Sequence, residues 1–92
     1  MDYEWDTAKA ATNIKKHGVS FEEAQTVFNN PLAVIFEDEL QSAQEYWEII
    51  IGHSQRNRLL LVSFTERPKA IRIISARVVT QREREHYENN AF

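Results

Sequence analysis

The stretch RLLLVSFTERPKAIRIISARVV, from Arg58 to Val79, decides the fold of this chain. Two runs rich in Leu, Val, Ile and Phe, residues 58–66 and 70–79, flank an Arg-Pro-Lys sequence at positions 67–69. Such runs are typical of strands buried on a pleated surface. Proline suits the intervening turn, because it has no backbone N–H to donate to a sheet. The stretch therefore predicts a β-hairpin.

A short turn gives this hairpin one register, with Phe64 opposite Ile73 and Thr65 opposite Arg72. In regular strands, alternate residues share a face. One face would carry Leu60, Val62, Phe64, Glu66, Ile71, Ile73, Ser75 and Arg77. The other would carry Leu59, Leu61, Ser63, Thr65, Arg72, Ile74, Ala76 and Val78. Each mostly apolar face then holds one arginine, and the two arginines can act together only if a bulge interrupts the strand.

The composition is that of one globular domain, residues 1–92, with 42% hydrophobic and 11% aromatic residues. The absence of cysteine excludes a disulfide framework and thiolate chemistry. No apolar run reaches the roughly 18–20 residues that span a bilayer, and the first residues lack the pattern of a secretory signal. We therefore expect a cytoplasmic protein that does not bind membranes.

The net charge of −3 argues against nucleic-acid binding, but the charges are unevenly distributed. Residues 21–50 hold seven acidic residues and no Lys or Arg, whereas residues 51–92 hold eight Lys or Arg and four acidic residues. Such a chain can present a basic surface to phosphates and an acidic one to a basic partner. Ordinary solvated faces explain the same counts equally well.

The N-terminal part predicts a short edge strand at residues 3–5 and a helix from Asp6 or Thr7 to residues 16–17, with Gly18 just past its end. The apolar positions of this helix are Ala10, Ala11 and Ile14. Another side, at spacings of three and four, carries Lys9, Asn13 and Lys16 or His17. The basic last turn, residues 15–17, suits either the helix dipole or a phosphate.

A second helix begins at Ser20, which has Glu23 at the spacing of a capping box. Its apolar stripe, which we expect in the core, consists of Phe21, Ala24, Val27 and Phe28. Strands are expected at residues 32–36 and 46–51, with an acidic loop between them. A second capping-box pattern, Thr80 with Glu83, predicts a final helix to about Glu88 that has almost no apolar stripe.

This order of elements predicts an α+β fold. An antiparallel β-meander of about four strands, with a short N-terminal strand, would be packed by two N-terminal helices and followed by a C-terminal helix. The sequence contains no glycine-rich phosphate loop and no metal-ligand spacing around His17, His53 or His86. We therefore expect no metal and no cofactor.

Two runs resemble the signatures of the BrnT toxin family. The first consists of Glu4-Trp5-Asp6, Lys9-Ala10, Asn13, Lys16 to Ala24 and Val27-Phe28. The second consists of Arg72 to Arg77, Thr80, Arg82-Glu83-Arg84 and Tyr87. The likeness covers nearly the whole chain, although residues 37–45 carry no signature. It implies a RelE-like fold and an RNA-cleaving toxin of a type II toxin–antitoxin system. It also implies a BrnA-type antitoxin, through which the complex would bind promoter DNA.

Metal-free RNA cleavage needs a base for the 2′-hydroxyl, cations for the pentacoordinate phosphate and an acid for the leaving oxygen. Arg72 and Arg77 suit the phosphate, because a guanidinium offers two parallel donors. Of the two we favour Arg77, which lies beside Ser75 at a strand end, together with Lys9 and His17 from the first helix. His17 is the natural acid or base, and Lys9 either stabilises charge or acts as a base. Glu66 is a further candidate at the other end of the hairpin. Each of these residues also has a purely structural explanation, such as a carboxylate pair, a helix end or a solvated side chain.

Three functions remain in competition. The first is an endoribonuclease toxin that inhibits translation. The second is a catalytically silent protein that pairs with an antitoxin in a repressor complex. The acidic segment 37–48 and the polar final helix would be its surfaces for the partner. The third is a toxin that targets DNA gyrase, as in the related ParE branch.

Overall fold

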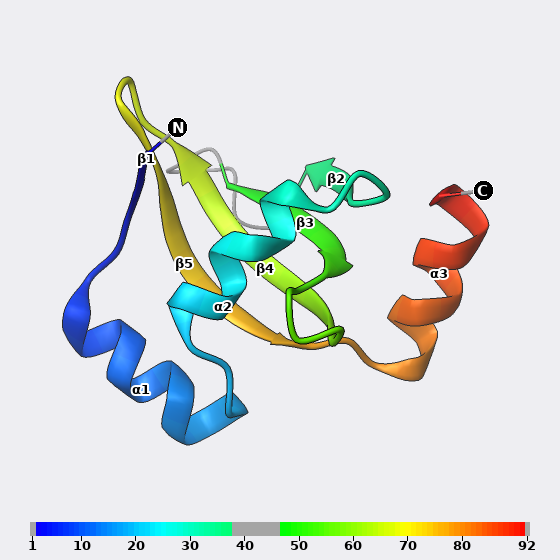
Figure 1. Ribbon diagram of the computed structural model, residues 1–92, viewed down its shortest axis with the longest axis horizontal. Coiled ribbons are helices and arrows are strands. Elements are labelled where there is room, and N and C mark those ends of the chain that lie inside the picture. Colours follow the sequence, from blue (N-terminus) through cyan, green and yellow to red (C-terminus); the bar gives the residue numbers. More distant parts are fainter. Residues whose placement is uncertain (1, 38–46, 92) are drawn as a thin grey trace.

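The computed structural model describes residues 2–37 and 47–91, which form one five-stranded sheet with the order β1-β5-β4-β3-β2 (Figure 1). The strands are β1 (Asp2–Glu4), β2 (Val34–Glu37), β3 (Glu48–His53), β4 (Leu59–Glu66) and β5 (Ala70–Val78). The helices are α1 (Thr7–His17), α2 (Phe21–Thr26), the 3₁₀ turn η1 (Val27–Asn29) and α3 (Gln81–Ala91). Strands β2 to β5 pair antiparallel, which confirms the predicted meander, and β1 lies parallel to β5 at the edge. Residues 38–45 of the predicted acidic loop and Tyr46 lie outside the described residues.

Local signals set the helix ends as expected. The Asp6 carboxylate accepts the backbone N–H of Lys9 at 2.9 Å and begins α1, and Gly18 ends it with a φ of 67°. Only glycine adopts this left-handed backbone without cost to a side chain. In α2, the Ser20 hydroxyl accepts the backbone N–H of Glu23 at 3.0 Å. These caps depend on neighbouring residues alone, and for that reason the sequence reveals them.

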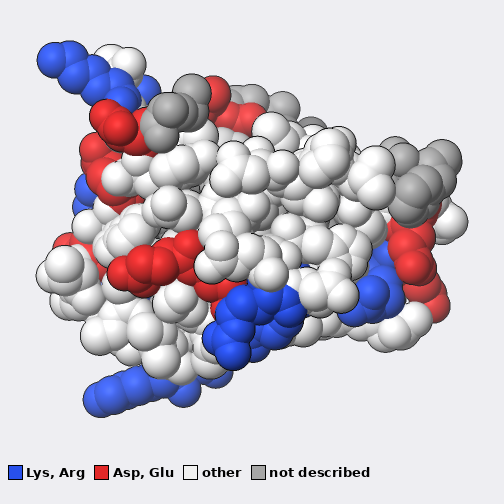
Figure 2. Space-filling view, viewed as in Figure 1, with Lys and Arg blue, Asp and Glu red and all other residues white. Residues whose placement is uncertain are grey.

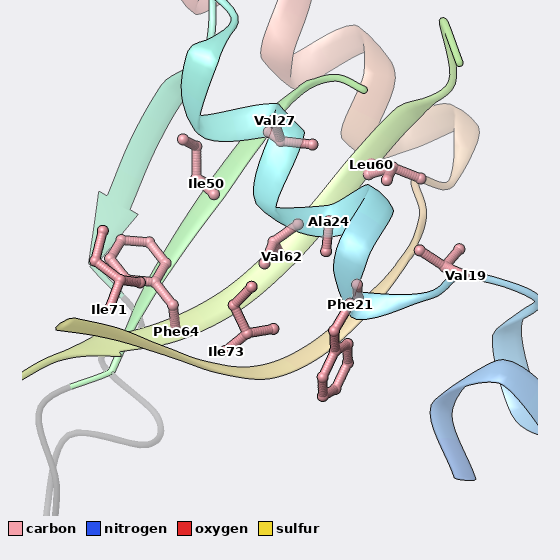
Figure 3. Close-up of a cluster of buried hydrophobic side chains, with 11 residues drawn as sticks. Val19, Phe21, Ala24, Val27, Ile50, Leu60, Val62, Phe64, Ile71 and Ile73 are labelled. Atoms are coloured by element: carbon pink, nitrogen blue, oxygen red, sulfur yellow. The ribbon is translucent and has the colours of Figure 1, made fainter. Parts of the chain in front are cut away.

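The face of the sheet that carries α2 holds the larger apolar cluster (Figure 3). Its buried members are Val19, Phe21, Ala24, Val27, Ile50, Leu60, Val62, Phe64, Ile71, Ile73 and Ala76. Phe21 and Ala24 come from α2 and Val27 from η1, which confirms the predicted stripe of the second helix, and Phe28 packs against the cluster at its margin. We call this face the α2 side.

The opposite face, which we call the α3 side, holds a second cluster of Ile51, Leu59, Leu61, Val79 and Tyr87. Helix α3 is polar along most of its length, and among its residues 81–89 Tyr87 is the buried side chain that joins this cluster. The Tyr87 hydroxyl donates to the backbone oxygen of Leu32 at 3.0 Å. The His86 ring also packs against Phe36, with ring centroids 5.2 Å apart. Aromatic contacts thus help to attach the C-terminal helix, and a search for an apolar stripe does not detect them.

A bulge in β5 overturns the predicted faces of the hairpin. Phe64 pairs with Ile73 as expected, but Ser63 pairs with Ser75, so that Ile74 is an extra residue. Beyond it, Arg77 pairs with Leu61, on the α3 side, and Ala76 joins the α2-side core. The extra residue shifts the alternation by one, which is the effect of a β-bulge. Ser75 and Arg77 therefore lie on the face predicted for Ala76 and Val78.

Helix α1 also differs from the expectation, because its buried residue is polar. Asn13 is 6% exposed, whereas Ile14, a predicted apolar contact, is 50% exposed. The Asn13 amide donates to the backbone oxygens of Val19 and Ala76 at 2.9 and 2.8 Å and accepts the N–H of Ala76 at 3.1 Å. A buried amide with such partners carries no desolvation penalty. Asn13 thus joins α1 to β5 just beyond the bulge.

Candidate functional site

A groove of about 300 Å³ runs between α1 and the bulged part of β5. We call it the α1–β5 groove, and its walls are Ala8, Lys9, Thr12, Asn13, Lys16, His17, Ile74 and Ser75. The helix supplies positions three and four residues apart, which lie on one side of an α-helix. The predicted polar side of this helix is confirmed, and it brings Lys9 and His17 into one site. Thr12 and Ser75 were not predicted to belong to it.

Apart from the buried and hydrogen-bonded Asn13, the polar side chains of this groove are available to a ligand. Among residues 2–37 and 47–91, no hydrogen bond or ion pair engages the ammonium groups of Lys9 and Lys16, the His17 ring or the hydroxyls of Thr12 and Ser75. At the start of α1, the pKa of Asp6 is lowered mainly by its bond from the Lys9 N–H and further by the charges of Lys9 and Arg72. The groove therefore combines basic groups with free hydroxyl groups.

The bulge places both predicted arginines on the α3 side. Arg72 pairs across the strands with Thr65, and Arg77 pairs with Leu61, which lies in the same row of β4. Arg72 is also close enough to Asp6, the first-turn cap of α1, to lower its pKa. The bulge thus brings Arg72 and Arg77 to one face of the sheet, which is the condition for the two arginines to act together. Their row on β5 also includes Ser75, which lines the groove.

Each arginine has a carboxylate partner. Arg72 Nη1 lies 2.9 Å from Glu4 Oε2 in a pair whose side chains are 32% and 44% exposed. Arg77 makes two parallel bonds of 2.7 Å to Glu83, at the start of α3. These bonds, with those from Thr80, hold the pKa of Glu83 at about 2, and the Glu83 carboxylate raises the pKa of Arg77. The single bond of Arg72 is therefore easier for a competing anion to displace than the bidentate pair of Arg77, although the Arg72 side chain is slightly less exposed, at 32% against 36%.

Glu66 does not belong to this constellation. It follows Phe64 on the α2 side and is exposed at the end of the hairpin, opposite Ile71. The prediction that it shares a face with Arg77 is wrong, because the bulge moves Arg77 to the other face. On the view of the α2 side in Figure 2, the basic side chains stand in separate groups with acidic or uncharged surface between them. The described part of that view shows no continuous basic patch.

The fold and the groove define the class: a small α+β domain with a basic site on a bulged antiparallel sheet. A family model described as "Ribonuclease toxin, BrnT, of type II toxin-antitoxin system" matches residues 5–83. The chain belongs to this family of ribonuclease toxins. It is similar to the crystal structure of the Brucella abortus ribonuclease toxin BrnT, with 26% sequence identity over 88% of this chain and 99% of that chain and a TM-score of 0.69. A comparison with curated proteins found no match.

The family membership confirms the predicted toxin class, and a type II toxin implies an antitoxin partner. The α+β architecture with its C-terminal helix agrees with the Brucella structure. Among the described residues, no helix combines the length and apolar character needed to cross a bilayer.

Proposed function

We propose that this chain is a metal-independent endoribonuclease whose site is formed by α1 and β5. The observation that carries the proposal is the α1–β5 groove, which adjoins the row of Arg72 and Arg77. In it, the side chains of Lys9 and His17 have no hydrogen-bond or ion-pair partner in the described part of the chain. Family membership supports RNA as the substrate. We further propose that a BrnA-type antitoxin neutralises it in the cytoplasm and carries the complex to promoter DNA.

The reaction divides among these side chains according to their chemistry. A base removes the 2′-hydroxyl proton, the oxygen attacks the adjacent phosphorus, and the P–O5′ bond breaks, which leaves a 2′,3′-cyclic phosphate and a protonated 5′-hydroxyl. We give proton transfer to His17, because histidine exchanges protons near neutral pH. Lys9 is exposed, and we give it and Arg72 the stabilisation of the phosphorane charge.

Arg77 has a conditional role in this scheme. Both of its Nη atoms donate to Glu83 in a bidentate pair, so its charge is already compensated and a phosphate must compete with that carboxylate. Arg72 has only one bond to an exposed glutamate, which an incoming phosphate displaces more easily. We place Glu66 outside the site, because it lies on the other face.

The test is cleavage of end-labelled RNA by the purified chain, with EDTA or with Mg²⁺, and with or without ribosomes. We expect cleavage in EDTA, ends that carry a cyclic phosphate, and a rate at least about 100-fold lower in His17→Ala, the usual scale of acid–base catalysis. Lys9→Ala and Arg72→Ala should lower the rate, whereas the exposed Arg82→Ala, on α3, should not. A folded wild type that cleaves no RNA in any of these settings would refute the nuclease assignment. Cleavage lost in EDTA would refute metal independence.

A growth assay tests the same proposal in cells. Induction of the wild type in bacteria should arrest growth and produce new RNA ends, and co-expression of a BrnA-type antitoxin should restore growth. Growth arrest without new RNA ends, together with inhibition of gyrase supercoiling in vitro, would instead favour the ParE-like alternative. No arrest by the folded protein would favour the catalytically silent one.

A further inference from the structure

One wall of the α1–β5 groove contains more polar groups than the cleavage scheme uses. Lys9, Thr12 and Lys16 follow one another at intervals of three and four residues, so they form a row along α1 with one turn of the helix between neighbours. Ser75 faces this row from β5. Since Lys9 and His17 already have roles, Thr12, Lys16 and Ser75 remain as one ammonium and two hydroxyl groups without a partner among the described residues.

The opposing elements are held at a fixed separation. Asn13 lies within the same helical turns and makes three bonds, two of them to the backbone of Ala76, the residue after Ser75. Asn13 is 6% exposed, so water does not compete for these bonds. Thr12 precedes Asn13 in the chain and Ser75 precedes Ala76, the two residues that these hydrogen bonds join. Their hydroxyl groups are therefore presented to the groove by backbone that is already ordered.

We propose that Lys16, Thr12 and Ser75 form a subsite for a backbone phosphate of the RNA, next to the phosphate that is cleaved. This inference rests on the proposed nuclease function for the identity of the ligand. An ammonium group supplies a charge and three donors, and hydroxyl groups donate further bonds to phosphate oxygens. Among the described lining residues, His17 is the only one with a ring, and its proposed role is proton transfer, so we expect the subsite to read the RNA backbone and not its sequence.

The alternative explanation is that Lys16 only complements the negative end of the α1 dipole. Lys15 precedes it in the same last turn and has the same charge, but it does not line the groove. If the helix dipole is their only role, substitution of either lysine should change RNA binding to the same extent. A phosphate subsite predicts an effect for Lys16 alone. Lys15→Gln is therefore a matched control for Lys16→Gln, with the same change of charge and almost the same position.

The experiment measures binding of the full chain to a fluorescent 2′-O-methyl oligonucleotide, which cannot be cleaved, over a range of KCl concentrations. We expect Lys16→Gln to weaken binding by about threefold to tenfold at low salt. It should also reduce the slope of log K against log salt by about 0.7, the value for one lost contact to a single strand. Lys15→Gln should change neither, and Ser75→Ala should weaken binding with the slope unchanged. The losses should be equal for oligonucleotides of two unrelated sequences.

The outcomes separate this subsite from the cleavage reaction. Equal effects of Lys15→Gln and Lys16→Gln, or no binding by the wild type, would overturn the subsite, whether or not the wild type cleaves RNA. A selective loss in Lys16→Gln would support the subsite even if the wild type cleaves nothing, in which case only the nuclease proposal fails. Circular dichroism of each variant checks the fold, which substitutions of exposed lysines leave intact.

Discussion

At the scale of single residues, a buried ion pair joins α2 to the turn between β3 and β4. The carboxylate of Glu23 is 3% exposed and accepts bonds from Arg58 and, at 2.6 Å, from the Ser54 hydroxyl. The bond from Arg58 is the main reason that the pKa of Glu23 is lowered. The capping-box pattern predicted that this carboxylate returns to Ser20. The guanidinium is the better partner, because it carries a full charge.

We predict that Glu23→Gln destabilises the protein by about 2–3 kcal/mol. Removal of one member of a buried ion pair leaves the other charge without compensation, which usually costs about 3–5 kcal/mol. The expected cost lies at the bottom of this range or just below it, because Arg58 is 33% exposed. Urea unfolding at neutral pH measures this difference. The control is Glu22→Gln, one position earlier and exposed, which should change the free energy of unfolding by less than about 0.5 kcal/mol. Similar midpoints for the two variants would contradict a structural role for the pair.

At the scale of elements, α3 shows how a polar helix stays docked. Its attachments are the Tyr87 anchor and the carboxylate of Glu83, which accepts both the Thr80 N–H at 2.9 Å and the two bonds from Arg77. One side chain thus caps its own helix and ties it to β5. The predicted capping box is confirmed. Its link to Arg77 depends on the bulge, which places that arginine on the α3 side.

We predict that this attachment weakens in acid. The pKa of Glu83 is about 2 in the folded chain and about 4.5 in the unfolded chain, so the unfolded state binds the proton more readily. Its stabilisation is complete above about pH 4.5 and is lost as the pH falls toward 2. The full shift corresponds to about 3 kcal/mol, which solvent screening at the 36% exposed Arg77 reduces to about 1–2 kcal/mol.

Urea unfolding between pH 6 and pH 2.5 tests this prediction. Glu83→Gln should lower the free energy of unfolding at pH 6. Between pH 6 and pH 2.5 the variant should then lose less of this free energy than the wild type, because the carboxylate that titrates is gone. Glu88→Gln, on the same helix and exposed, should follow the wild type. If Glu83→Gln and the wild type lose the same free energy over this range, the Arg77 pair does not carry the pH dependence.

At the scale of the whole molecule, the two apolar clusters lie on opposite faces of one sheet and share their strands. Leu60 and Val62 face the α2 side, while Leu59 and Leu61 face the α3 side. Loss of β4 would expose both clusters at once. The basic groove lies at the β5 edge, beside this core, where residues 74 and 75 are only partly buried. The site is thus supported by a rigid sheet without being part of the core.

We predict that the chain unfolds in one cooperative transition. The two clusters have no separate supporting strands, so neither can melt while the other remains intact. Trp5 packs against the α2-side cluster, and in Trp47→Phe its fluorescence would report on that side alone. In this variant, urea curves from fluorescence and from far-UV circular dichroism should coincide. Separated midpoints would show that the two faces of the sheet unfold independently.

The sequence by itself determined whatever depends on near neighbours. The helix caps, the hairpin turn and the Phe64–Ile73 register involve residues close in the chain, and α1 brings Lys9 and His17 together by its own periodicity. The strand alternation could not locate the bulge, because both faces of the hairpin are apolar and an extra isoleucine fits either one.

Only the tertiary structure decided what depends on distant partners. Asn13 is buried because the backbone of Ala76, 63 residues away, satisfies its amide. The pairing of Arg77 with Glu83, and the common face of Arg72 and Arg77, follow from the extra residue that β5 accommodates beside β4. Long-range backbone partners and an extra residue within a strand leave no local signature, and for that reason the shape of the groove emerges only when α1 packs against β5.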